Sequence, residues 1–124
     1  MTEPETILQL YNELVASGLC IFPLTGKVNV SSRHGVYIIY DSENNVLLVG
    51  MTPYGKDGLN QRLYNHISKT GVFYRNYLKT RNICLRGTHR FRFIEVDNPR
   101  HRALLEALTA GFLCPAHFGT GVKM

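Results

Sequence analysis

Residues 35–50, with the sequence GVYIIYDSENNVLLVG, decide the fold of this chain. Residues 35–40 and 46–50 are runs of aliphatic, β-branched and aromatic side chains, and they flank the polar residues 41–45. Two such runs joined by a short polar loop are typical of a β-hairpin. Because both runs are almost continuously apolar, we expect both faces of the resulting sheet to be covered.

A helix is predicted before the hairpin, over residues 2–17. Thr2 and Glu5 have the spacing of a capping box, apolar side chains recur along one helical stripe, and Gly18 favours a stop. This helix would cover one face of the sheet or form a dimer contact. Residues 19–33 are rich in turn-forming residues, which predicts a loop with one short extended piece.

Four more elements are predicted after the hairpin. Residues 59–69 are typical of a helix that buries every fourth side chain, and residues 73–80 of a second, short helix. Residues 89–96 are predicted as a third strand, and a last helix begins at Pro99 and runs to about residue 110, where a glycine follows. This order of elements predicts an α+β fold, in which helices flank a three-stranded, mainly antiparallel sheet.

Length and composition favour one domain. The 124 residues suffice for one modest core, so we predict a single domain over residues 1–124, with an N-terminal helix within residues 1–18. No run of 18 apolar residues is present, and the acidic N-terminus does not resemble a signal peptide. The three cysteines are far apart and form no CxxC pair, which supports neither a zinc site nor a disulfide framework. We therefore expect a cytoplasmic protein that does not cross a membrane.

Positive charge is concentrated in residues 58–94. This segment contains no Asp or Glu but eight Lys and Arg residues, in a chain of net charge +5. A field of one sign attracts a polyanion, although a solvated basic face would have the same composition. We predict nucleic acid as the partner of seven of these eight side chains, the eighth being Arg62, which is considered below as a catalytic residue. We add a lysine of the preceding loop that could reach a phosphate. The residues predicted to bind nucleic acid are Lys56, Lys69, Arg75, Lys79, Arg81, Arg86, Arg90 and Arg92.

Three residues, Arg62 among them, have the chemistry of a phosphodiester-cleaving site. Arg62 and His66 are four residues apart, so they share one face of the predicted helix. Glu106 lies among alanines and leucines, where a carboxylate costs free energy unless it is paired or bound to a metal ion. A single carboxylate would suit Mg²⁺, which keeps several waters. The alternatives are an exposed Arg, a His bonded to a backbone carbonyl, and an ion pair between Glu106 and Arg102 or an arginine of the basic segment.

The ordered set of these residues resembles the GIY-YIG nuclease family. In that family two motifs on a β-hairpin precede a helix with Arg and His and a later helix with Glu. Here the motifs are matched by residues 35–37 and 48–50, followed by Arg62, His66 and Glu106. The resemblance covers residues 35–118, so residues 34–118 are predicted as a GIY-YIG-like nuclease core.

The resemblance implies a metal-dependent DNA endonuclease with Tyr37, Arg62, His66 and Glu106 as catalytic residues. By the family's pattern Tyr37 lies at the active site, Arg62 contacts the scissile phosphate and His66 helps to activate the nucleophile. Glu106 would bind the single divalent ion, Mg²⁺ or Mn²⁺. DNA is the implied substrate, and a homodimer or a protein partner could supply sequence selectivity.

Two positions depart from the family pattern. Leu48 replaces the tyrosine of the second motif, so Tyr37, Tyr40 or His66 would have to act as general base. An Asn that often follows the last helix is matched in spacing by Phe118, with His117 as the nearest polar candidate. These departures leave two alternatives open: a nucleic-acid-binding module that has lost turnover, and an interaction domain for an acidic protein.

Overall fold

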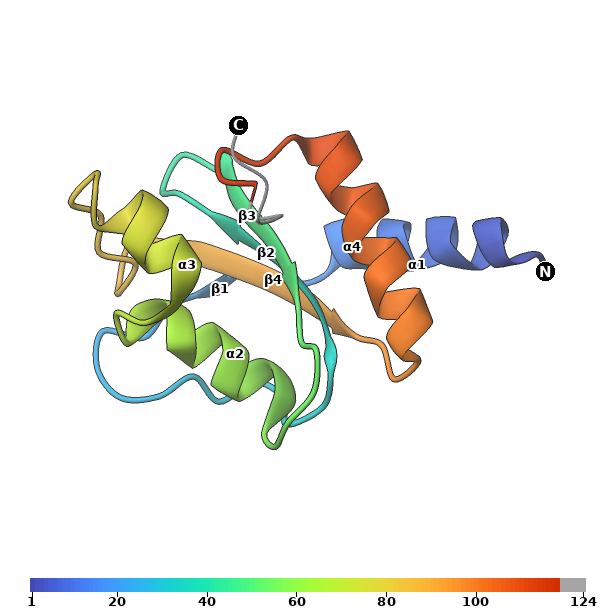
Figure 1. Cartoon of the computed structure of the whole chain (residues 1–124), viewed down its shortest axis with the longest axis horizontal. Helices are drawn as coiled ribbons and strands as arrows, with labels where there is room; N and C mark the ends of the chain where they lie inside the picture. Colours follow the sequence, from blue (N-terminus) through green and yellow to red (C-terminus); the bar gives the residue numbers. More distant parts are fainter. Residues whose placement is uncertain (119–124) are drawn as a thin grey trace.

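The computed structural model describes residues 1–118, and the last six residues of the predicted domain lie outside the described residues. Its centre is an antiparallel sheet with the strand order β1-β4-β2-β3 (Figure 1). The strands are β1 (Cys20–Ile21), β2 (Gly35–Tyr40), β3 (Val46–Met51) and β4 (Arg90–Glu95). The predicted α+β fold and hairpin are therefore confirmed, with β2 hydrogen-bonded to both β3 and β4.

The sheet has four strands, one more than predicted. The extra strand, β1, is the short extended piece expected within residues 19–33, and Cys20 pairs with Phe91 of β4. Two residues are too few to display an alternating pattern, so pairing with β4 could not be inferred from the sequence alone.

Helices cover both faces of the sheet, as the apolar strands require (Figure 1). On one face lie α1 (Glu3–Ala16) and α4 (Pro99–Leu113), and their core includes Val36 and Ile38 of β2. On the other face lie three helical segments, whose core includes Tyr37 and Ile39. These segments are α2 (Gly58–Ile67), α3 (Gly71–Phe73) and η1 (Tyr74–Leu78). Successive strand residues point to opposite faces, and here both faces are buried.

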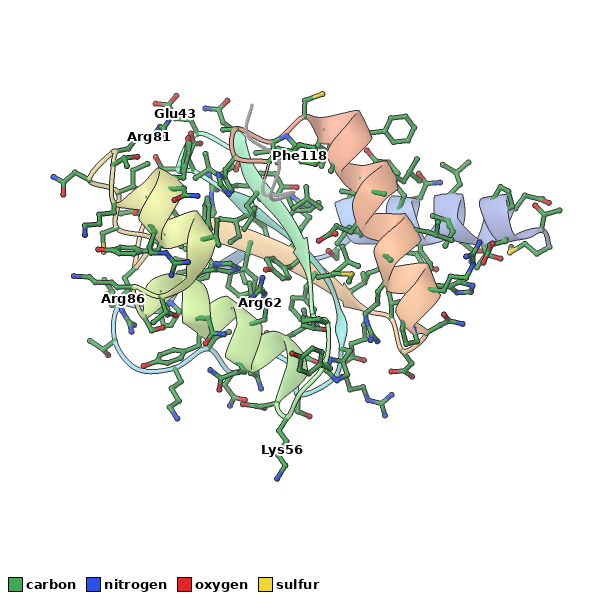
Figure 2. The ribbon with its side chains drawn as sticks, viewed as in Figure 1. Glu43, Lys56, Arg62, Arg81, Arg86 and Phe118 are labelled. Carbon is green, nitrogen blue, oxygen red and sulfur yellow. The ribbon has the colours of Figure 1, made fainter. Side chains whose placement is uncertain are left out.

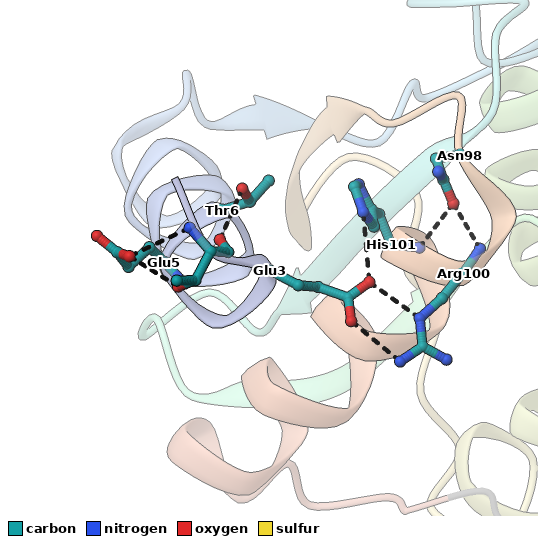
Figure 3. Close-up of polar contacts among 7 residues, drawn as sticks. Glu3, Glu5, Thr6, Asn98, Arg100 and His101 are labelled. Atoms are coloured by element: carbon teal, nitrogen blue, oxygen red, sulfur yellow. Dashed lines mark hydrogen bonds and ion pairs between the residues drawn. The ribbon is translucent and has the colours of Figure 1, made fainter.

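The ends of the two long helices follow local sequence signals, with one exception (Figure 3). At α1 the predicted capping box is present, with the Thr2 side chain accepting the Glu5 N–H. At α4 Pro99 occupies the first turn after the cap Asn98. The predicted stop at residue 110 is wrong, because α4 continues through Gly111 to Leu113. A glycine inside a helix costs only about 1 kcal/mol, which tertiary packing can offset.

The short helix predicted over residues 73–80 is α3 continued by the π-helical turn η1. The amide of Lys79 donates to the carbonyl of Tyr74, five residues earlier. Among residues 1–118, no helix has the length and apolar content needed to cross a membrane.

Candidate active site

Tyr37 occupies a position that depends on a glycine in the neighbouring strand. Tyr37 of β2 lies directly opposite Gly50 of β3. A Cβ atom at Gly50 would collide with the Tyr37 ring and hydroxyl, so only glycine lets the ring lie across β3. The Tyr37 hydroxyl then reaches α2, where it forms a hydrogen bond of 2.7 Å with Nε2 of His66.

The Tyr37–His66 pair is buried and electrically neutral. Burial raises the pKa of Tyr37 to about 12, an effect that the nearby Arg62 guanidinium opposes. Burial also lowers the pKa of His66 to about 3, and the positive charge of Arg62 and the nearby His117 act in the same direction. Around neutral pH the phenol therefore keeps its proton and the imidazole carries no charge. The alternative considered above, a His66 bonded to a backbone carbonyl, is therefore wrong, because the partner of His66 is the Tyr37 hydroxyl.

A cleft of about 520 Å³ brings the four predicted catalytic residues together. Its lining includes Leu48 and Gly50 of β3, which is the edge strand of the sheet. In Figure 1 the helices α2 and α3 lie on one side of β3, and α4 lies on the other. Figure 2 shows Arg62 projecting from α2 toward the sheet. The residues of the predicted set that line this cleft are Tyr37, Arg62, His66 and Glu106.

Glu106 is a half-buried carboxylate that faces this cleft from α4. Burial raises its pKa, and the positive charge of Arg62 partly offsets that effect. The ion pair with Arg102, considered above as an alternative, is not formed. Arg102 is buried and donates instead to the carbonyl oxygens of Val96 and Asp97. None of the ion pairs within residues 1–118 involves Glu106.

The donor set limits which metal ion the cleft could hold. No group of three or more His, Cys, Asp or Glu side chains is arranged to bind a metal anywhere in the described part of the chain. A zinc site of the usual three or four protein ligands is therefore not present there. One carboxylate beside an open cleft fits Mg²⁺ or Mn²⁺, which complete their shells with water and phosphate oxygens. Glu106 is the acidic residue that lines the cleft.

Three of the cations predicted to bind nucleic acid are engaged with the protein's own backbone. Arg86 donates to the carbonyls of Pro23 and Gly26, and Arg90 donates to that of Ser42. Arg92 donates to carbonyls at the end of α1 and lies over the Tyr40 ring. It therefore contacts the helices on the face of the sheet opposite α2. Because Arg92 and Tyr40 face away from the cleft, neither is positioned to act in it.

The other five cations are placed around the α2 side of the molecule. Lys69 and Lys79 line a smaller pocket of about 170 Å³ that shares His66 with the cleft. Arg81 stacks on the ring of Tyr77, with 4.0 Å between the guanidinium carbon and the ring centroid. The remaining two, Lys56 and Arg75, are exposed. Figure 2 shows Lys56 pointing into solvent.

One side chain of the cleft comes from a segment whose position the sequence did not predict. After α4 the chain crosses to the edge of β3, where Ala116 N–H and His117 N–H donate to the carbonyls of Val46 and Leu47 over 3.0 and 2.9 Å. This pairing places His117 in the cleft. Phe118, which matches the family's Asn in spacing, is half exposed and is not among the lining residues. The sequence indicates His117 only as the nearest polar candidate, because no periodic pattern predicts that irregular backbone pairs with a strand.

Comparison with known families agrees with the geometry of this cleft. A family model described as the GIY-YIG catalytic domain matches residues 33–109, which is more than half of the chain. The matched segment includes Tyr37, Arg62, His66 and Glu106 and ends before His117. A search of the curated proteins finds no significant match. The chain belongs to the GIY-YIG family and has that family's nuclease-type fold.

Proposed function

We propose that this protein is a metal-dependent DNA endonuclease that hydrolyses phosphodiester bonds. The observation that carries the proposal is the meeting of Arg62, Glu106 and the Tyr37–His66 pair in one open cleft. Phosphodiester cleavage needs a bound phosphate, stabilisation of the charge that develops on its oxygens, and a positioned water. A cleft with one arginine, one half-buried carboxylate and a fixed phenol–imidazole pair has groups suited to these tasks.

Each residue has a defined part in the proposed reaction. The Arg62 guanidinium would donate to two phosphate oxygens, an interaction that strengthens as negative charge develops in the transition state. Glu106 would hold Mg²⁺ or Mn²⁺, which when bound supplies further stabilisation of that charge. Tyr37 and His66 would orient the phosphate or the water by hydrogen bonding, because both are neutral at the pH of the reaction.

The proposed DNA surface lies on the α2 side of the cleft. Its five cations are the ones that are not tied to backbone carbonyls, together with Arg62 in the cleft itself. Binding through phosphates releases counterions, so affinity should fall steeply as salt rises. The side chains assigned to this surface are Lys56, Lys69, Arg75, Lys79 and Arg81. A cytoplasmic location and a homodimer or a selectivity-giving partner stay predictions from the sequence.

The proposal is tested by nicking of supercoiled plasmid DNA. The protein should convert supercoiled to open-circular DNA with Mg²⁺ or Mn²⁺ and should do nothing in excess EDTA. The slope of log affinity against log salt, measured in EDTA, should be clearly negative. A wild-type protein that binds DNA but cleaves no plasmid under any metal condition would overturn the assignment as an enzyme.

A second candidate function, DNA binding without cleavage, is favoured by one observation. Leu48 lines the cleft at the position of the second motif's tyrosine, and leucine cannot accept a proton. The discriminating variant is Leu48→Tyr. Activity that is absent in the wild type and gained with Leu48→Tyr would identify the chain as a binder on a nuclease fold. Activity that is already present in the wild type would exclude this candidate.

A further inference from the structure

His117 is held in the cleft by the backbone rather than by its own side chain. The two main-chain hydrogen bonds to Val46 and Leu47 fix the segment against the edge of β3. The imidazole is half-buried and packs against Phe73, with 5.4 Å between ring centroids, and against Tyr77 at 6.0 Å. A substitution of the side chain would therefore leave the anchoring hydrogen bonds in place.

Each of the other ionisable side chains that line the cleft already has a partner or a role in the proposed site. Tyr37 and His66 hydrogen-bond to each other in a buried pair. Arg62 carries a guanidinium, which has hydrogen-bond donors but no acceptor. Glu106 is the carboxylate to which the proposed metal ion is assigned. His117 is the remaining one, and its ring makes no hydrogen bond with any residue of the described chain.

We infer that His117 is the general base that takes a proton from the attacking water. The inference rests on the proposed endonuclease function and names a residue of that same site. One imidazole nitrogen of His117 accepts a proton as the water oxygen forms its bond to phosphorus. The bond from phosphorus to the leaving oxygen breaks, and that oxygen takes a proton from solvent. The proton on His117 is then released to solvent, so the group is regenerated.

The surroundings of His117 keep its ring in the form that can accept a proton. Burial lowers its pKa, and the nearby positive charge of Arg81 lowers it further. His66 faces it from α2 and is neutral, and Phe73 and Tyr77 contribute only aromatic contacts. A base that is mostly unprotonated near neutral pH, yet partly open to solvent, suits proton transfer from water.

The test compares His117→Ala with the wild type in nicking at saturating plasmid. Loss of a general base should lower the cleavage rate by about 10²-fold or more. DNA affinity, measured by fluorescence anisotropy in EDTA, should stay within about twofold, and added imidazole should restore part of the rate. The wild-type rate should fall at acid pH as His117 is protonated, and this ionisation should be missing from the residual rate of His117→Ala.

His89→Ala is the matched control, because His89 is also a half-buried histidine with a lowered pKa but does not line the cleft. It should cleave at the wild-type rate. His117→Gln serves as a second variant with a polar side chain that is not a base, and circular dichroism checks that each variant is folded. Full activity in His117→Ala or His117→Gln overturns this inference alone. A rate loss with matching loss of affinity and no response to imidazole also overturns it, whereas an inactive wild type overturns the proposed function itself.

Discussion

The first turn of α4 and its middle use acidic side chains in opposite ways. At the first turn Glu3 of α1 binds Arg100 through two contacts of 2.9 and 3.0 Å, and His101 lies 3.6 Å from the same carboxylate (Figure 3). The cap Asn98 accepts the backbone N–H groups of Arg100 and His101. Every charged group in this cluster is exposed or partly exposed and has a partner.

Glu106 lies about two turns further along α4 and, unlike Glu3, is half-buried and forms no ion pair within residues 1–118. Hydrogen bonding to Arg100 lowers the pKa of Glu3, whereas burial raises the pKa of Glu106. The environment of Glu3 favours its charged form, and the environment of Glu106 disfavours it. A carboxylate that the fold holds at a cost in free energy is a candidate for function, because binding a cation would recover that cost. A carboxylate with satisfied partners at a helix end is a structural feature.

The largest expected effect is that of Glu106→Gln. Removing the charge should abolish metal-dependent nicking, while DNA affinity in EDTA stays equal or rises because a repulsive charge is lost. Thermal stability should be unchanged or higher, since a half-buried charge has been removed. Plasmid nicking, anisotropy and a thermal melt together test this. Retained nicking would show that Glu106 and Glu3 do not differ in function.

Arg62→Ala should have the next largest effect. The guanidinium is expected to stabilise the transition state by about 3–4 kcal/mol, so the cleavage rate should fall by roughly 10²–10³-fold. Arg62→Lys keeps the charge but not the fork of donors, and should recover only part of the rate. Single-turnover rates at saturating DNA give the measurement. Equal rates for Arg62→Ala and the wild type would remove Arg62 from the proposed site.

Burial of His66 should make the fold sensitive to acid. Its pKa of about 3 in the folded protein lies below the ordinary value of 6.5. Between these values the unfolded chain binds more protons, so the free energy of unfolding should fall as pH falls, by up to about 1.4 kcal/mol per pH unit. Urea denaturation from pH 7 to pH 4 measures this. His66→Gln, which can still bond to Tyr37, should flatten the dependence; an equally steep curve for that variant would assign it to other groups.

The smallest effect is expected for a substitution of Glu3, whose carboxylate has its partners at the first turn of α4. Glu3→Gln removes the negative charge from the ion pairs with Arg100 and His101, but exposed ion pairs contribute little to stability in water. The melting temperature should fall only slightly, less at high salt, and nicking should proceed at the wild-type rate. A loss of activity comparable with that of Glu106→Gln would contradict the contrast between the two sites.

Most of the fold could be predicted because its signals are local. The hairpin follows from two apolar runs around a polar loop, and the start of each long helix follows from the cap residues Thr2 and Asn98 with their neighbours. The end of α4 could not be predicted in the same way. The continuation through Gly111 depends on packing that offsets a small local preference, and the helix ends where Cys114 adopts a left-handed φ of 47°.

The sequence by itself determined the α+β fold, the family, and the chemical types that any site could use. The tertiary structure decided which of those groups meet. Strand register places Gly50 opposite Tyr37. Arg92 and Arg62 lie on opposite faces of the sheet, because Arg92 binds the end of α1. His117 lies in the cleft because its backbone pairs with β3. Local patterns in the sequence show how apolar side chains recur along a helix or strand over a few residues. They do not report contacts between distant segments, which form only when the whole core packs.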